Sequence, residues 1–138
     1  MPLKTVRGKC MHDTVIGGRL PSVSALSYLG DAVHSLYVRR TLVERGLSKS
    51  ADLNAEALKF VTAEAQAEMY RKIEPHLLDD EREVFKRAFN SSHLNKPKRA
   101  SGADYRAATG FEAVLGMLHF IGDTERLDYL LELAHKND

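Results

Sequence analysis

Hydrophobic residues recur at helical spacing along most of the chain. The first run begins near Pro21 and Ser22 and stops at Gly46, since proline suits a first helical turn, serine caps free amides and glycine favours a helix end. The pattern predicts a helix over residues 21–46, preceded by an N-terminal arm over residues 1–20. The apolar positions of this helix share one face: Leu26, Leu29, Val33, Leu36 and Tyr37.

Two more helices are predicted in the middle of the chain. The first is capped by Ser48 or Ser50 and ends at Glu74, because a helical conformation is disfavoured for the residue before a proline. The second begins at Asp80, which forms a capping-box pattern with Glu83. Their apolar positions are Leu53, Leu58, Val61, Ala65 and Met69 in the first helix, and Val84, Phe85 and Phe89 in the second.

The helical period is lost over residues 90–102, which predicts an exposed loop. Ser101 caps the next predicted helix, which ends at Gly122, and Asp123 or Thr124 caps a last one. The predicted fold class is therefore all-α, a helical bundle without a sheet. The apolar positions of these two helices are Ala107, Phe111, Val114, Leu115, Leu118, Ile121, Leu127, Leu130, Leu131 and Leu133.

The composition fits one globular domain over residues 1–138, with 43% hydrophobic and only 7% aromatic residues. The chain has 20 lysines and arginines against 19 acids, so a polybasic tail is excluded as the main device for binding nucleic acid. No apolar run approaches the roughly 20 residues that span a bilayer, and the first residues lack the apolar core of a signal peptide. We therefore expect a cytoplasmic protein.

Two acids interrupt apolar helices. Asp31 follows Gly30, and Glu112 lies one turn before Gly116. Glycine inside a helix costs roughly 1 kcal/mol relative to alanine, so it indicates that something approaches the backbone closely. We expect the two helices to cross at these glycines and bring the acids together as oxygen ligands for Mg²⁺. The alternative, which spacing alone favours, is that each acid pairs with a lysine or arginine.

Basic residues cluster around the predicted loop, where they could neutralise the phosphates of a nucleic acid. A solvated surface loop is an equally good interpretation of the composition alone. His34 and His119 share helices with the two acids; we expect them on the helix surface, and a contact behind the acids is the alternative. The candidate RNA-binding residues are Lys86, Arg87, Lys96, Lys98, Arg99 and Arg106.

The two acidic helices resemble a known family. Residues 26–33, LSYLGDAV, resemble the signature helix of ribonuclease III catalytic domains, and residues 105–116, YRAATGFEAVLG, resemble their second acidic helix. The length leaves no room for a separate double-stranded-RNA-binding domain, which points to the Mini-ribonuclease III branch. The likeness extends over nearly the whole chain and includes the basic loop.

The resemblance implies an all-helical homodimer that cleaves double-stranded RNA with Mg²⁺, leaving 5′-phosphate and 3′-hydroxyl ends. Asp31 and Glu112 match the family's principal metal-binding acids, and Glu64 resembles a further acid. Similarity to the Mini branch also implies maturation of the large-subunit (23S) ribosomal RNA precursor of a bacterium, with a ribosomal protein helping to shape the target.

The sequence departs from the family at three positions. Full-length members have glutamate where this chain has Ser24 and Ser27, and aspartate where it has Thr109. We therefore expect weaker magnesium binding, or fewer ions, in the absence of substrate. The missing acids motivate a second hypothesis, a noncatalytic dimeric RNA-binding protein on the same fold. A helical phosphohydrolase acting on nucleotides is a third, because two acids and Mg²⁺ would also serve it.

Overall fold

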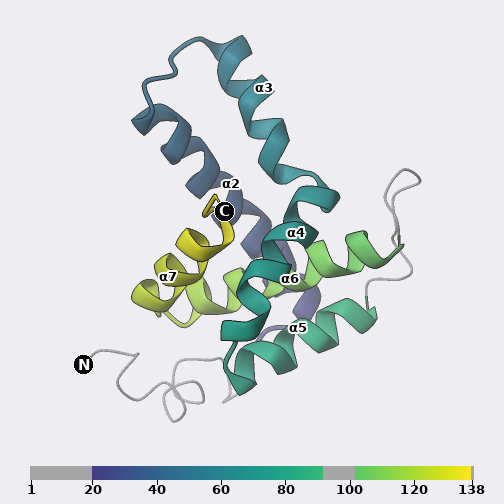
Figure 1. The fold of residues 1–138 in the computed structure, drawn as a ribbon. Coiled ribbons are helices and arrows are strands. Elements are labelled where there is room, and N and C mark those ends of the chain that lie inside the picture. The colour runs from purple at the N-terminus through teal and green to yellow at the C-terminus, as the bar shows by residue number, and fades with distance from the viewer. Residues whose placement is uncertain (1–19, 92–101, 138) are drawn as a thin grey trace.

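The computed structural model describes residues 20–91 and 102–137, and Figure 1 shows their arrangement. Within these ranges the chain is helical and contains no strand, which confirms the predicted all-α class. The basic loop and nearly all of the predicted N-terminal arm lie outside the described residues. The elements are α2 (Val23–Glu44), α3 (Ser50–Val61), α4 (Ala63–Ile73), the 3-10 helix η3 (Glu74–His76), α5 (Asp79–Ser91), α6 (Gly102–Phe120) and α7 (Thr124–Ala134).

Helix α6 is the centre of the bundle. Helices α2, α4, α5 and α7 all pack against it, and its buried residues lie on every side of the helix. A helix that is apolar all round is stable only when neighbours cover it on every side. The six apolar positions predicted for this part of the chain are buried or nearly so: Ala107, Phe111, Val114, Leu115, Leu118 and Ile121.

Helix α2 turns a different face to the core from the predicted one. Leu36, expected in the core stripe, is 68% exposed, whereas His34, expected on the surface, is fully buried. Positions two apart on a helix differ by about 200°, so the two residues lie on nearly opposite sides. Gly30 must face α6 where the helices cross, and this sets the rotation of α2. The buried line runs through Leu26, Gly30, His34, Val38 and Leu42.

The single helix predicted from residue 48 to residue 74 is two helices. Thr62 adopts an extended backbone conformation (φ −73°, ψ 159°), and its hydroxyl accepts a hydrogen bond from the amide of Ala65. A threonine that caps a helix start in this way competes with continuation of the preceding helix. Neither Ser48 nor Ser50 caps α3, since Lys49 occupies that position without a side-chain bond.

Other helix ends follow the predicted chemistry more closely. Ser22 and Asp123 cap α2 and α7 by accepting amide hydrogen bonds, and Gly46 and Gly122 have positive φ just past the ends of α2 and α6. The predicted capping pair of Asp80 and Glu83 is wrong by two residues. Glu81 instead accepts from the amide of Leu78 at 2.8 Å, because α5 begins at Asp79 and its cap is therefore Leu78, two residues before Asp80.

Glu81 also joins α5 to α7. Its carboxylate is completely buried and accepts two hydrogen bonds of 2.9 Å from Arg126, whose guanidinium also donates to the carbonyl of His76. A buried acid is tolerated only when it is paired and hydrogen-bonded in this way. No helix in the described part of the chain is both long and apolar enough to cross a membrane.

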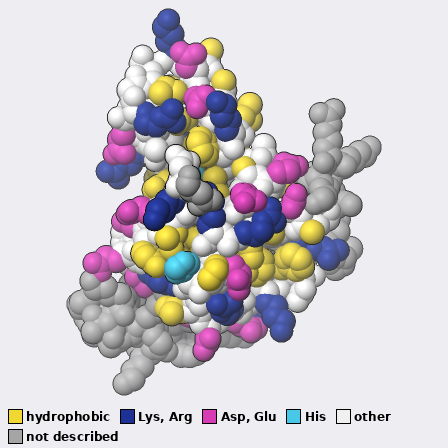
Figure 2. Space-filling view, viewed as in Figure 1, with side chains coloured by type: hydrophobic (Ala, Val, Ile, Leu, Met, Phe, Trp, Pro, Cys, Tyr) yellow, Lys and Arg dark blue, Asp and Glu magenta, His cyan; other side chains and the backbone are white. Residues whose placement is uncertain are grey.

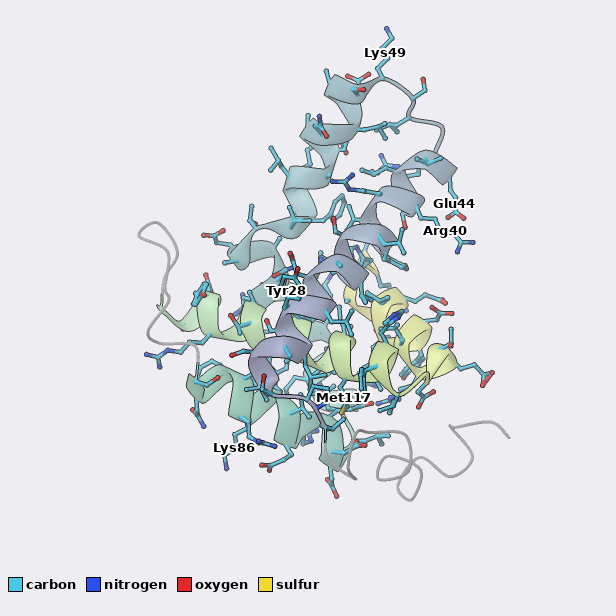
Figure 3. All side chains as sticks on the ribbon, turned by 180° about the vertical axis from the view of Figure 1, so that it is seen from behind. Tyr28, Arg40, Glu44, Lys49, Lys86 and Met117 are labelled. Carbon is cyan, nitrogen blue, oxygen red and sulfur yellow. The ribbon has the colours of Figure 1, made fainter. Side chains whose placement is uncertain are left out.

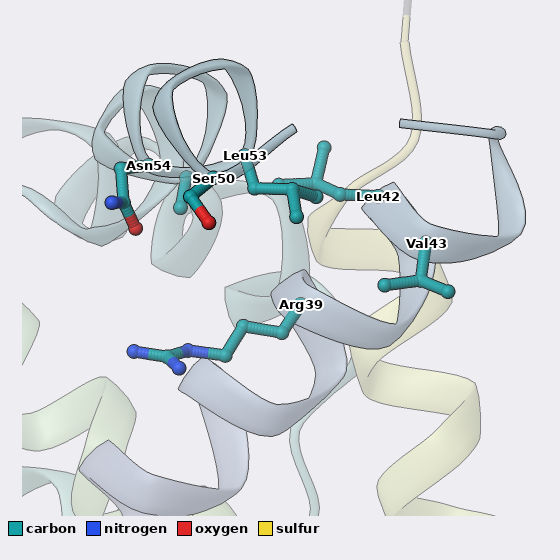
Figure 4. A pocket seen from close by; sticks show the side chains of 7 residues that line it. Arg39, Leu42, Val43, Ser50, Leu53 and Asn54 are labelled. Atoms are coloured by element: carbon teal, nitrogen blue, oxygen red, sulfur yellow. The ribbon is translucent and has the colours of Figure 1, made fainter. Parts of the chain in front are cut away.

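The C-terminal half of α2 and the whole of α3 project from the body of the bundle (Figure 1). No residue of α3 is fully buried. A hollow of about 340 Å³ lies between these two helices, and Figure 4 shows its lining of Arg39, Leu42, Val43, Ser50, Leu53, Asn54 and Ala57. It contains no carboxylate and lies apart from the predicted acid pair.

Candidate active site

The site is formed where α2 and α6 cross in direct backbone contact. A Cβ atom on Gly30 would overlap the carbonyl oxygen of Glu112, and one on Gly116 would overlap the carbonyl oxygen of Leu26. Only glycine permits backbones to approach this closely. The crossing at the two glycines confirms the arrangement that their positions predict.

The crossing brings Asp31 and Glu112 into contact. The pKa of Glu112 is raised from 4.5 to about 8, chiefly by burial and then by a hydrogen bond to Asp31 and the charge of Asp31. Two carboxyl groups this close cannot both ionise cheaply unless a proton or a cation lies between them. Glu112 therefore holds its proton near neutral pH in the absence of a cation.

Neither acid forms an ion pair with a lysine or arginine among the described residues. The other partners of Glu112 are neutral. Gln66 donates a hydrogen bond of 3.2 Å to Oε2, and Ser27 donates a long one of 3.5 Å to Oε1. Pairing with basic residues, the interpretation that spacing alone favours, is therefore wrong for this part of the chain.

A polar cavity of about 220 Å³ opens beside Glu112. Hydroxyl groups dominate its lining, which consists of Val23, Ser24, Ser27, Ser91, Tyr105, Thr109 and Glu112. The hydroxyl of Thr109 is turned back to the carbonyl of Tyr105 at 3.0 Å. The three positions at which the sequence departs from the family, Ser24, Ser27 and Thr109, thus share one cavity wall.

Carboxylate and hydroxyl oxygens are the hard donors that Mg²⁺ prefers, and the ion commonly takes one or two carboxylates while keeping several waters. Asp31 and Glu112 fit that requirement. The cavity beside them leaves room for water or a phosphate oxygen. The described residues contain no group of three or more acidic, histidine or cysteine side chains that could hold a metal ion.

Glu64 lies in the first turn of α4 with its side chain exposed. It is two residues from Gln66, about 200° around the helix, and therefore on the other side from the residue that contacts Glu112. The structure does not bring it into a three-ligand group with Asp31 and Glu112. The proposed metal ligands below are accordingly those two acids.

Three of the six predicted RNA-binding residues lie in the part of the chain that the structure describes. Lys86 and Arg87 are exposed on α5, and Lys86 is labelled in Figure 3. Arg106 is half-buried on α6, with its guanidinium 5.9 Å from the centre of the Phe89 ring. On the face shown in Figure 2, basic and acidic side chains are intermixed. Three of the predicted residues lie outside the described part: Lys96, Lys98 and Arg99.

Sequence reasoning missed Gln66. It stands between Ala65 and Ala67 and looks like an ordinary helix residue, yet it is only 3% exposed. The available signal is its spacing from Met69 and Ile73, which places an amide on the apolar face of α4. His34 was missed for a similar reason, since its regular four-residue spacing from Gly30 and Leu26 was not used.

Comparison with known proteins agrees with this geometry. Residues 24–123, which include both acids, match the Ribonuclease III domain family. The two crossing helices therefore belong to a ribonuclease III catalytic domain.

Close relatives narrow the assignment. The chain is 42% identical over 109 residues to Mini-ribonuclease 3 of Symbiobacterium thermophilum, covering 79% of this chain and 84% of the relative. It is 43% identical over 109 residues to Mini-ribonuclease 3 of Streptococcus pneumoniae, covering 78% and 85%. The protein belongs to the Mini-ribonuclease 3 family, a family of endoribonucleases.

A solved structure has the same fold. The crystal structure of a protein from Fusobacterium nucleatum superposes with a TM-score of 0.74 at 27% identity, covering 80% of this chain and 88% of that one. The helical arrangement described above is thus shared with an experimentally determined structure.

Proposed function

We propose that this protein is a magnesium-dependent endoribonuclease that cleaves double-stranded RNA. The observation that carries the proposal is the contact between Asp31 and Glu112 at the helix crossing, beside a hydroxyl-lined cavity. Two adjacent carboxylates without a basic partner form a site that a divalent cation would complete.

In this proposal Asp31 and Glu112 hold the ion, with Ser27 and Gln66 orienting the two oxygens of Glu112. Bound Mg²⁺ supplies Lewis-acid activation of water and neutralises charge that develops on the phosphate. The products are a 5′-phosphate and a 3′-hydroxyl. Because Glu112 is largely protonated near neutral pH, it must release its proton to act as a ligand.

Duplex RNA is the substrate that suits the chain. A-form RNA exposes phosphates and 2′-hydroxyls across a shallow minor groove, so contacts there recognise duplex shape more than sequence. Lys86 and Arg87 on α5 and Arg106 at the start of α6 supply positive charge on the elements that flank residues 92–101. We assign Lys96, Lys98 and Arg99 to the same role.

The protein acts as a homodimer in this proposal. Tyr28, Leu36 and Val43 are 85%, 68% and 60% exposed, and they lie within about 80° of one another around α2, opposite the side that faces α6. Tyr28 is labelled in Figure 3. An exposed apolar strip of this kind is typical of an interface, and a second copy of the chain is the occupant proposed here. Sedimentation as a monomer at micromolar concentration would exclude this part.

The family likeness supports a cellular role in maturing the 23S ribosomal RNA precursor in the bacterial cytoplasm, with a ribosomal protein shaping the target. These statements rest on the relatives and not on any feature of the site itself.

Cleavage of a synthetic RNA duplex tests the central proposal. We expect Mg²⁺-dependent cutting by the wild-type protein and background rates for Asp31→Asn and Glu112→Gln, because either change removes a negative ligand. Asp52→Asn, at an exposed position on α3, is the matched control and retains activity. Cutting by both acid variants at the wild-type rate would contradict the proposal.

The second function is a noncatalytic dimer that binds double-stranded RNA. The hydroxyls of Ser24, Ser27 and Thr109 favour it, because they reduce the negative charge available to hold a cation. Binding of the RNA duplex by the wild-type protein, without cleavage in the presence of Mg²⁺ or Mn²⁺, would support this second function.

A further inference from the structure

Four side chains from four parts of the fold form a continuous network behind the acid pair. Glu112 on α6 accepts from Gln66 on α4 at 3.2 Å, Gln66 contacts Nδ1 of His34 on α2 at 3.0 Å, and Nε2 of His34 contacts Nε2 of His135 at 2.9 Å. Gln66 and His34 are 3% and 0% exposed. We call Glu112, Gln66, His34 and His135 the Gln66 network.

With Glu112 ionised, the donors and acceptors in the network have one consistent arrangement. The amide nitrogen of Gln66 has two hydrogens, and it uses one for Oε2 of Glu112 and the other for Nδ1 of His34. His34 must then carry its own hydrogen on Nε2 and donate it to His135. His135 in turn accepts on Nε2 and carries its hydrogen on Nδ1.

Both histidines are neutral in this arrangement, as the network requires. Burial lowers the pKa of His34 to about 3, with the nearby His135 acting in the same direction. Burial also lowers the pKa of His135, to about 4, with a smaller effect of the charge of Lys72. A protonated His34 would present a hydrogen at Nδ1 and could not accept from Gln66.

The far end of the network is fixed by packing. The ring of His135 lies 4.8 Å from that of Tyr37 and 5.5 Å from that of Phe60, and the backbone of His135 closes α7 through hydrogen bonds to Leu131 and Leu133. The ring of His34 meets Phe111 edge-on at 5.3 Å. The two rings therefore cannot rotate freely to satisfy another partner.

We propose that Gln66 is a positioning residue for the active site, and that His34 and His135 lock its amide so that the nitrogen always donates to Glu112. When Glu112 is ionised, as metal binding requires, and the hydrogen of His34 is on Nε2, rotation of the amide by 180° would place its oxygen against two acceptors, Nδ1 of His34 and the carboxylate. The inference rests on the proposed function, since it assigns Glu112 as a metal ligand.

A carboxylate held at Oε2 by Gln66 keeps Oε1 beside Ser27, which lines the cavity. Partners of this kind orient metal ligands, and their removal typically lowers metal affinity or activity by about 10- to 100-fold. Gln66 itself touches neither substrate nor the proposed ion, so it acts through Glu112.

The first test is Mn²⁺ binding by the full-length protein without RNA, measured by electron paramagnetic resonance. Gln66→Met keeps the length of the side chain and removes both donated hydrogens. We expect its dissociation constant for Mn²⁺ to rise about 10- to 100-fold over wild type. Glu68→Met, on the exposed side of the same helix, is the matched control and leaves Mn²⁺ binding unchanged. An unchanged constant in Gln66→Met would overturn the proposal.

Cleavage kinetics distinguish positioning from a general structural effect. Gln66→Met raises the Mg²⁺ concentration for half-maximal rate and lowers kcat, while KM for duplex RNA stays at the wild-type value. A change in KM alone would contradict a role at Glu112. If Gln66→Met fails to fold, His135→Phe is tested in its place, because phenylalanine keeps the ring packing and removes only the acceptor. We expect a smaller loss of Mn²⁺ affinity and of kcat in this variant. Wild-type values of both would overturn the proposal.

Nitrogen-15 spectra of the histidine rings, recorded above pH 8 so that Glu112 is ionised, test the network without metal or RNA. The proposal requires the hydrogen of His34 on Nε2 and that of His135 on Nδ1 in the wild-type protein, and the opposite assignments would overturn it. If the wild-type chain neither binds Mn²⁺ nor cuts RNA, the proposed function fails, and these spectra still decide the orientation of Gln66.

Discussion

At the scale of single residues, the site combines two acids with unusually neutral surroundings. The hydroxyl of Ser27 lies 3.5 Å from Glu112, at a position where the resemblance to full-length family members implies glutamate. Replacing an acid by a hydroxyl keeps an oxygen near the site and removes a charge. The affinity of the site for cations therefore depends on the residue at position 27.

Ser27→Glu restores the missing charge. We expect the Mg²⁺ concentration for half-maximal cleavage to fall by several fold, since each added carboxylate strengthens binding of a hard cation. The measurement is a Mg²⁺ titration of duplex cleavage. Ser48→Glu, at an exposed position beyond the far end of α2, is the control and leaves the titration unchanged. An identical titration for Ser27→Glu and wild type would show that this position does not face the bound ion.

The sequence predicts the acid pair at this scale but not the residue behind it. Gly30 and Gly116 are an unusual feature of two apolar helices, and their cost in helix propensity implies a close contact. Gln66 carries no such cost, because glutamine is common on exposed helix surfaces. Its burial depends on which side α4 turns toward α6, and the packing of whole helices decides that.

At the scale of helices, the crossing of α2 and α6 determines the site. The prediction succeeded where the helix ends have a local chemical cause, such as the cap at Ser22 or the positive φ of Gly46. It failed where two effects compete. The apolar pattern continues through Thr62, but the capping hydroxyl of that threonine breaks the helix.

Gly116→Ala tests the crossing. Alanine would gain about 1 kcal/mol in helix propensity, but its methyl group overlaps backbone atoms of α2, which cannot rotate away. Overpacking of this kind typically costs about 1–3 kcal/mol; at the upper end of that range, and after subtraction of the gain in propensity, we expect a net loss of about 2 kcal/mol. Urea unfolding measures it.

Ala55→Ser adds one atom to the exposed face of α3 and is the control, with a change of less than about 0.5 kcal/mol. Activity falls with stability in Gly116→Ala because the two acids are pushed apart. A variant as stable and as active as wild type would mean that the helices can separate without disturbing the site.

At the scale of the whole molecule, buried histidines make stability depend on pH. The pKa of His34 is lowered from 6.5 to about 3, and that of His135 from 6.5 to about 4, both chiefly by burial. Below pH 6.5 the unfolded chain binds protons that the folded protein excludes. The free energy of unfolding therefore falls as the pH is lowered from about 6.5 toward 3.

Melting temperatures measured without metal between pH 4 and pH 7 check this dependence. His34→Phe is expected to flatten the decline on the acidic side, whereas His119→Phe, at an exposed position, keeps the wild-type slope. Glu112, whose pKa is raised from 4.5 to about 8, destabilises the fold as pH rises through this range. That contribution is present in both variants and cancels in their comparison. Equal slopes in the two variants would exclude His34 as the cause.

Burial is distributed unevenly among the helices, and so are the local opening reactions of the backbone. Helix α3 contributes no fully buried residue, whereas α6 is enclosed by four neighbours. We therefore expect amides in α3 to exchange with deuterium through local fraying, and amides in α6 to exchange only through global unfolding. Because Glu112 belongs to the enclosed helix α6, the projecting end of the protein can open locally without separating the two acids.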